Sequence, residues 1–167
     1  MEHICARLHR RKPQGDRRTD ELRWASKLRK QFSQAETAAI LETVKLREKA
    51  VVKFPCAEKL YFQAEALEQS TSFAIAIERS RVLAEYRKQI DDIEGPILDL
   101  GCGIGGDLLA LGQYHSVIAY EIDPVRARLA QLNVDAMELK DKIEIRVADW
   151  RHDITEFQEK GIRVAFC

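Results

Sequence analysis

The spacing of hydrophobic residues along the chain changes near position 95. Over residues 19–94, apolar positions recur at the three- and four-residue spacing of helices that bury one face. One helix is expected to begin at Ser33, because Glu36 follows three positions later and completes a capping box. Another is expected over residues 72–89. The first part of the chain therefore predicts a helical N-terminal region.

The helix expected over residues 72–89 should have one apolar and one charged side. The residues of its apolar side would be Phe73, Ile77 and Val82. Those of its charged, solvent-facing side would be Glu78, Arg79, Arg87 and Lys88. We expect this helix to lie on the surface and to cover part of the core.

After position 95, short apolar runs alternate with helical stretches. Four runs predict strands, at residues 97–100, 117–120, 143–147 and 162–166. Helices are expected between them, over about 107–112, over 123–138, and in a short segment capped by Asp153 with Glu156. This alternation predicts right-handed crossovers and a parallel sheet. The expected fold is α/β: an N-terminal helical region followed by a partial Rossmann-like, doubly wound parallel sheet with strand order 3-2-1-4.

Charge is distributed unevenly, although the formal net charge is zero. Residues 1–30 contain ten Lys or Arg and four Asp or Glu, so this segment carries +6 and the rest of the chain −6. We expect residues 1–18 to form a disordered basic leader. Such an arm could contact nucleic-acid phosphates or remain solvated, and its lack of an aromatic residue before Trp24 favours solvation.

Cysteine spacing and hydropathy bear on metal binding, disulfide bonds and membrane contact. The cysteines are separated by at least 46 positions, which argues against a zinc site or a disulfide framework, so no metal is expected. No apolar stretch approaches the ~20 residues that span a bilayer, and no apolar signal segment is visible near the start. We expect a cytoplasmic protein without membrane contact, and the composition assigns no oligomeric state.

The first predicted strand runs directly into a glycine-rich turn, Asp99-Leu100-Gly101-Cys102-Gly103-Ile104-Gly105-Gly106. Glycine lets the backbone turn sharply and lets a ligand approach the amides at a helix start. Gly101, Gly103 and Gly106 fit the dinucleotide pattern G-x-G-x-x-G. With Asp99 in front, Gly101, Gly103 and Gly105 fit D-x-G-x-G-x-G instead. A turn that binds no ligand is a third interpretation.

Acidic residues at the ends of three successive strands bear on this choice. Asp99 would repel a pyrophosphate but could hold a cationic amino group, directly or through water. Glu121 could accept hydrogen bonds from both ribose hydroxyls in either class of ligand. Asp149 could accept from an adenine amino group, and Trp150 offers an apolar ring face or a backbone N–H. The three acids favour a sulfonium nucleoside with an amino-acid end over a dinucleotide.

These residues carry a resemblance to a known family. Residues 97–134, with Asp149 beyond them, resemble motifs I to III of class I S-adenosylmethionine-dependent methyltransferases. The run 99–107 resembles the trimethylguanosine-synthase-like group. It is more similar still to bacterial methyltransferases with a THUMP-like domain, whose segment before the sheet resembles Lys53-Phe54-Pro55 and residues 67–72. The likeness extends over about residues 28–167.

The resemblance implies S-adenosylmethionine as the cofactor, bound by residues 95–167 as the N-terminal half of the binding domain. The implied contacts are Gly101, Gly103 and Gly105 with the methionine part, Glu121 with the ribose and Asp149 with the adenine. Gln69, Ser70 and Thr71 would lie over the amino-acid end of the cofactor. The implied methyl acceptor, and partner, is RNA or another nucleic-acid base.

The family's acceptor-lining motif follows its fourth strand, and this sequence ends at Cys167, where that motif would begin. We therefore expect a fragment that binds the donor without transferring the methyl group by itself, and we assign no catalytic residue. Two other classes remain open. One is a fragment of an NAD-binding oxidoreductase, and the other is a non-catalytic module whose basic arm and helices bind RNA.

Overall fold

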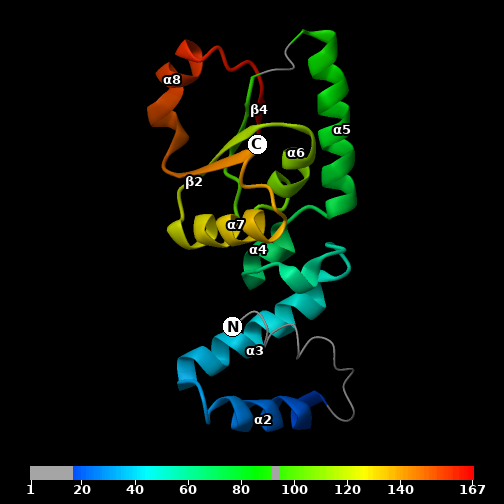
Figure 1. Ribbon diagram of the computed structural model, residues 1–167, viewed down its shortest axis with the longest axis vertical. Helices are drawn as coiled ribbons and strands as arrows, with labels where there is room; N and C mark the ends of the chain where they lie inside the picture. The colour runs from blue at the N-terminus through cyan, green and yellow to red at the C-terminus, as the bar shows by residue number, and fades with distance from the viewer. Residues whose placement is uncertain (1–16, 92–94) are drawn as a thin grey trace.

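The computed structural model describes residues 17–91 and 95–167 (Figure 1). The basic leader predicted over residues 1–18 lies almost wholly outside the described residues. The helical part consists of α2 (Arg17–Leu28), α3 (Gln34–Ala50), the 3-10 turn η1 (Ala57–Lys59), α4 (Ala64–Gln69) and α5 (Phe73–Gln89). The rest consists of β1 (Ile97–Leu100), α6 (Leu108–Tyr114), β2 (Val117–Glu121), α7 (Pro124–Ala136), β3 (Ile143–Val147), the 3-10 turn η2 (Trp150–Asp153), α8 (Ile154–Glu159) and β4 (Ala165–Phe166).

The four strands form one parallel sheet in the order β3-β2-β1-β4. The predicted fold class and strand order are therefore confirmed. Ile97 on β1 pairs with Val117 on β2, which pairs with Ile143 on β3. The carboxyl ends of these strands consequently lie at one edge of the sheet.

Alternate residues of the strands point to opposite faces of the sheet and pack in two separate hydrophobic clusters. Ile97, Val117 and Ala119 join a large cluster with residues of α6, α7 and the segment 54–67. Leu98, Ile118 and Tyr120 point to the other face, where Phe157 of α8 covers them. This follows from the period of two in a strand. The helical region and the sheet thus share the larger core, so the first segment of the chain can form part of a site at the sheet edge.

The α2 and α3 helices form a hairpin that extends away from the sheet (Figure 1). The predicted capping box is present: the Ser33 N–H donates to Glu36 Oε2 at 2.9 Å, and the Glu36 N–H donates to Ser33 Oγ at 3.3 Å. Leu28 and Ile40 form a small apolar cluster between the two helices. Among the described residues, none of the helices combines the length and the apolar character needed to cross a membrane.

One side of α5 differs from the prediction. Val82 was placed on the apolar side but is 54% exposed, and Arg87 was placed in solvent but is only 2% exposed. Arg87 Nη2 donates to the Gly95 carbonyl at 2.5 Å, and its Nη1 lies 3.3 Å from His115 Nδ1. His115 Nε2 in turn lies 3.2 Å from the Ser80 carbonyl. The buried guanidinium therefore ties α5 to the start of β1 and the end of α6.

The end of the chain also differs. The strand predicted over 162–166 is shorter, because the chain is still closing α8 through Gly161 at φ +63° and the Ile162 N–H bonds to the Phe157 carbonyl. Asp153 occupies the predicted N-cap position of α8, but its carboxylate makes no capping bond and instead accepts from the Tyr120 hydroxyl at 2.8 Å. The carboxylate that does cap here is Asp149, which accepts from the Arg151 N–H.

Candidate functional site

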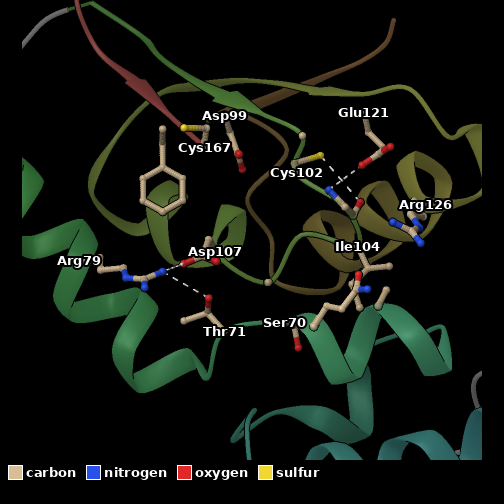
Figure 2. A pocket seen from close by; sticks show the side chains of 16 residues that line it. Ser70, Thr71, Arg79, Asp99, Cys102, Ile104, Asp107, Glu121, Arg126 and Cys167 are labelled. Atoms are coloured by element: carbon tan, nitrogen blue, oxygen red, sulfur yellow. Dashed lines mark hydrogen bonds and ion pairs between the residues drawn. The ribbon is translucent and has the colours of Figure 1, made fainter. Parts of the chain in front are cut away.

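A cavity of about 350 Å³ opens at the carboxyl ends of β1 and β2 (Figure 2). The sheet and its glycine turn form one wall, and the segment between α4 and α5 forms another. The predicted residues that line it are Asp99, Gly101, Gly103, Glu121, Gln69, Ser70 and Thr71. The structure therefore brings together side chains that are up to 52 positions apart in sequence, 69 to 121.

The glycine turn has the backbone that its sequence predicts. Gly101, Gly103 and Gly105 have φ values of +102°, +57° and +91°, in the region that favours glycine. The N–H groups of Gly101 and Cys102 both donate to the Tyr120 carbonyl at 2.9 Å, which anchors the turn to β2. Gly105 belongs to the turn but does not line the cavity. The three positive φ values follow the D-x-G-x-G-x-G spacing.

Glu121 lies at the end of β2 and is 7% exposed. One carboxylate oxygen accepts from the Gly103 N–H at 2.8 Å, and the other accepts from the Asp123 N–H at 2.8 Å. These bonds fix the carboxylate between the glycine turn and the start of α7. Each oxygen retains a second acceptor position, because a carboxylate offers about four. Glu121 can therefore both support the turn and accept from a ligand.

Asp99 is the least satisfied polar group of the site. It is 3% exposed, and its Oδ2 is buried without a hydrogen-bond partner among the described residues. Burial raises the pKa of this carboxyl to about 7, with smaller contributions from the charges of Asp107 and Glu121. A buried carboxyl without a partner is costly, and a cation would compensate it. The site therefore has a place for a positively charged ligand group.

A lysine from the helical region holds the segment over the cavity. Lys53 Nζ donates to the carbonyls of Leu67, Glu68 and Ser70 at 2.9, 2.8 and 2.8 Å. These carbonyls belong to the C-terminal turn of α4, where a cation is electrostatically favoured. On the other side, a Cβ at Gly106 would lie 3.3 Å from the Ser70 Cβ, so the segment packs directly on the start of α6.

Besides Gly105, two predicted residues are not on the cavity wall. The Asp149 carboxylate pairs with Arg151, whose hydrogen bonds lower the pKa of Asp149 to about 2. Trp150 packs with the core on the far face of the sheet. Both nevertheless follow β3, whose carboxyl end lies beside that of β2.

Several cavity residues were not predicted from the sequence. Those with ionisable side chains are Arg79, Asp107, Arg126, Cys102 and Cys167. Burial raises the pKa of the Cys102 thiol, so the sulfur remains protonated and is a poor nucleophile. Arg126 lies 3.3 Å from Gln63 and 3.4 Å from Glu65. No local pattern marked Arg79, because helix spacing placed it only on the charged side of residues 72–89. The residues that the structure describes contain no cluster of His, Cys, Asp or Glu that could hold a metal ion.

Comparisons with known proteins bear on the fold and on the family. Residues 94–167 match the family model described as RNA cap guanine-N2 methyltransferase. The chain is similar to a putative methyltransferase from Porphyromonas gingivalis W83, with a TM-score of 0.64 at 20% identity, over 94% of this chain and 37% of that one. The likeness shows a shared fold, a Rossmann-like α/β domain with a parallel sheet. The present chain spans about a third of the length of that structure.

A second solved structure, the complex of aTrm5 with tRNALeu, has a TM-score of 0.36 at 19% identity, over 65% of this chain and 32% of that one. The comparison with curated proteins gives no match. The family match over residues 94–167 and the likeness in fold to the Porphyromonas gingivalis structure are both likenesses to methyltransferases.

Proposed function

We propose that this chain binds S-adenosylmethionine in the cavity at the glycine turn and forms the donor-binding part of a class I methyltransferase. The observation that carries the proposal is the buried, unpartnered carboxylate oxygen of Asp99. It sits where a pyrophosphate would be repelled and where an ammonium group would be held. This favours an amino-acid nucleoside over NAD.

The remaining contacts follow from the positions of the residues. Glu121 accepts from the ribose hydroxyls with the acceptor positions that its two backbone bonds leave free. Gln69, Ser70 and Thr71 cover the amino-acid end from the wall opposite Asp99 (Figure 2). The adenine extends toward the end of β3, where Asp149 accepts from its amino group once the carboxylate releases part of its contact with Arg151. Trp150 contributes its backbone N–H, because its ring packs in the far core.

When bound, the cofactor would supply an activated methyl group on its sulfonium. The residues of this chain would hold the donor, and in-line displacement of a methyl group depends mainly on positioning. We assign no general base.

The acceptor that we propose is RNA or another nucleic-acid base, in the cytoplasm. The match of residues 94–167 to a family described by RNA cap guanine-N2 methylation supports it. The narrower likeness to trimethylguanosine-synthase-like and THUMP-like methyltransferases is part of the same proposal.

Calorimetry with S-adenosylhomocysteine, the product that shares every proposed contact, tests the donor site. The chain should bind this ligand and should not bind NADH under the same conditions. Glu121→Ala and Asp149→Ala should each weaken binding, with circular dichroism as a check that each variant folds. A folded chain that gives no heat with S-adenosylhomocysteine, or that binds NADH instead, would contradict the proposal.

A further inference from the structure

The charges of the cavity wall are unequal. Three carboxylates line it (Asp99, Asp107 and Glu121), together with two guanidinium groups (Arg79 and Arg126). An amino-acid end carries an ammonium and a carboxylate, so Asp99 accounts for only half of its charge. A carboxylate placed among three acids needs a cation of its own. One of the two arginines is the available partner.

Arg126 is already occupied at the other end of the cavity. Its Nε lies 3.3 Å from Gln63 Oε1, and its guanidinium pairs with Glu65 at 3.4 Å and with Asp123 at 3.8 Å. It lies on the same side of the cavity as Glu121, which is the proposed ribose end (Figure 2).

Arg79 approaches from α5 on the opposite side of the cavity (Figure 2). Its Nη1 lies 3.4 Å from Thr71 Oγ1 and 3.5 Å from Asp107 Oδ1, both at the outer limit for a hydrogen bond. Its Nε and Nη2 have no hydrogen-bond partner in the described part of the chain. Two donors of a planar fork therefore remain for a ligand.

The position of Arg79 is fixed from both ends of α5. At the start of the helix, the Phe73 N–H donates to the Lys53 carbonyl at 2.8 Å. Toward its end, buried Arg87 contacts His115 and Gly95. The side chain itself is 52% exposed, so it can turn toward a ligand at small cost.

We propose that Arg79 binds the carboxylate of the methyl donor's amino-acid end. Thr71 Oγ1 supplies a further donor, and Asp107 acts as a positioning residue that orients the guanidinium. The inference rests on the proposed function, since it concerns the same cavity. Arg79 and Asp99 would then recognise the two charges of one zwitterion from opposite walls.

The test compares two ligands that differ only at this end. S-adenosylhomocysteine carries the amino-acid end, and 5′-methylthioadenosine lacks it. By calorimetry at low salt, Arg79→Gln should weaken S-adenosylhomocysteine binding about 10-fold, the effect of losing a partly exposed charge-assisted contact. Binding of 5′-methylthioadenosine should not change. Arg79→Lys should restore part of the affinity, because it keeps the charge without the fork.

The matched control is Arg81→Gln. Arg81 lies on the same helix, is similarly exposed, pairs with Glu78 and does not line the cavity, so neither ligand should be affected. The inference is overturned if Arg79→Gln leaves S-adenosylhomocysteine binding unchanged, or if it weakens both ligands equally, which would indicate a structural role. A wild-type chain that binds neither ligand overturns the proposed function, and the inference with it. Binding of 5′-methylthioadenosine alone overturns the inference and leaves a nucleoside site.

Discussion

The two walls of the cavity are built in different ways. The sheet wall places Asp99 and Glu121 at the ends of β1 and β2, and its backbone is fixed within one turn by bonds to the Tyr120 carbonyl and the Glu121 carboxylate. The helical wall places Thr71 and Arg79 opposite, and Lys53 fixes it through contacts that are 14 to 17 positions apart in sequence. The first wall presents carboxylates, and the second presents hydroxyls and a guanidinium.

The two walls differ in whether the residue that would bind the ligand also determines the stability of the wall. On the sheet wall, Asp99 is both the group that would bind the ligand and a source of instability, because its carboxyl is buried and one of its oxygens has no hydrogen-bond partner among the described residues. On the helical wall, Lys53 holds the segment in place through its hydrogen bonds, and it does not itself line the cavity. Substitution of Asp99 should therefore raise the free energy of unfolding and lower the affinity for the ligand. Substitution of Lys53 should lower both quantities.

The largest effect is expected from Asp99→Asn. The native state holds the Asp99 proton up to a pKa of about 7, whereas the unfolded chain releases it near the usual value of 3.8. The native state therefore binds more protons between these values, and its stability falls as pH rises from 4 to 7. Asn avoids this cost, so at pH 8 the free energy of unfolding should rise by about 2–4 kcal/mol. Urea titrations at pH 4 and pH 8 measure it.

At pH 4 the variant and the wild type should have nearly equal stability, because this pH is close to the pKa of Asp99 in the unfolded chain and little of the cost of ionisation has yet developed. Binding should change in the other direction: S-adenosylhomocysteine affinity at pH 8 should fall roughly 100-fold, as expected for loss of a buried charge partner. In the wild type, affinity should rise with pH through about 7. A variant that is less stable at pH 8, or that binds unchanged, would contradict the assignment of Asp99.

The next effect is expected from Lys53→Met. It removes three charged hydrogen bonds to the end of α4, so the free energy of unfolding should fall by about 2 kcal/mol. Affinity for S-adenosylhomocysteine should fall as well, because residues 69–71 lose their anchor. Lys49→Met is the matched control, since Lys49 makes one exposed ion pair with Glu68 and should change neither quantity measurably. Equal effects of the two substitutions would indicate that Lys53 is not an anchor.

The same contrast explains what could be predicted from the sequence. The sheet wall depends on local patterns: an apolar strand, glycines with positive φ, and an acid at a strand end. The strand order and the places of Asp99 and Glu121 were therefore predicted correctly. The helical wall depends on long-range partners, and no local pattern shows that Arg79 points into a cavity.

Arg87 illustrates the second case. Helical periodicity placed it in solvent, because its partners His115 and the Gly95 carbonyl lie beyond its own helix and cannot be deduced from helix spacing. Asp149 illustrates a third case. Its position after β3 was correctly predicted, but its pairing with Arg151 two residues later was not. The strand and turn pattern of the sequence therefore did not give the orientation of the Asp149 carboxylate.

A smaller effect is expected from the titration of His115, which lies behind the helical wall. Burial lowers the pKa of its imidazole, and the charge of Arg87 acts in the same direction. The unfolded state then binds more protons just below pH 6.5, so the His115 contribution to native stability should be lost as pH falls through that value, opposite in sign to the contribution of Asp99. In an Asp99→Asn background, which lacks the Asp99 titration, His115→Gln should remove the dependence below pH 6.5, measured by urea titration. A slope that persists with both substitutions would assign it to other groups.

The smallest effect on the cavity is expected from Ser33→Ala, in the hairpin that extends away from the sheet. Loss of the cap should lower the free energy of unfolding by about 1 kcal/mol, because the Glu36 N–H loses its acceptor. S-adenosylhomocysteine affinity should remain that of the wild type, since the α2–α3 cluster makes no part of the cavity wall. This variant is therefore a control for the effect of general destabilisation on ligand binding. If a stability loss here also weakened binding, the binding loss in Lys53→Met would reflect general destabilisation, and the helical wall would have no specific role in holding the donor.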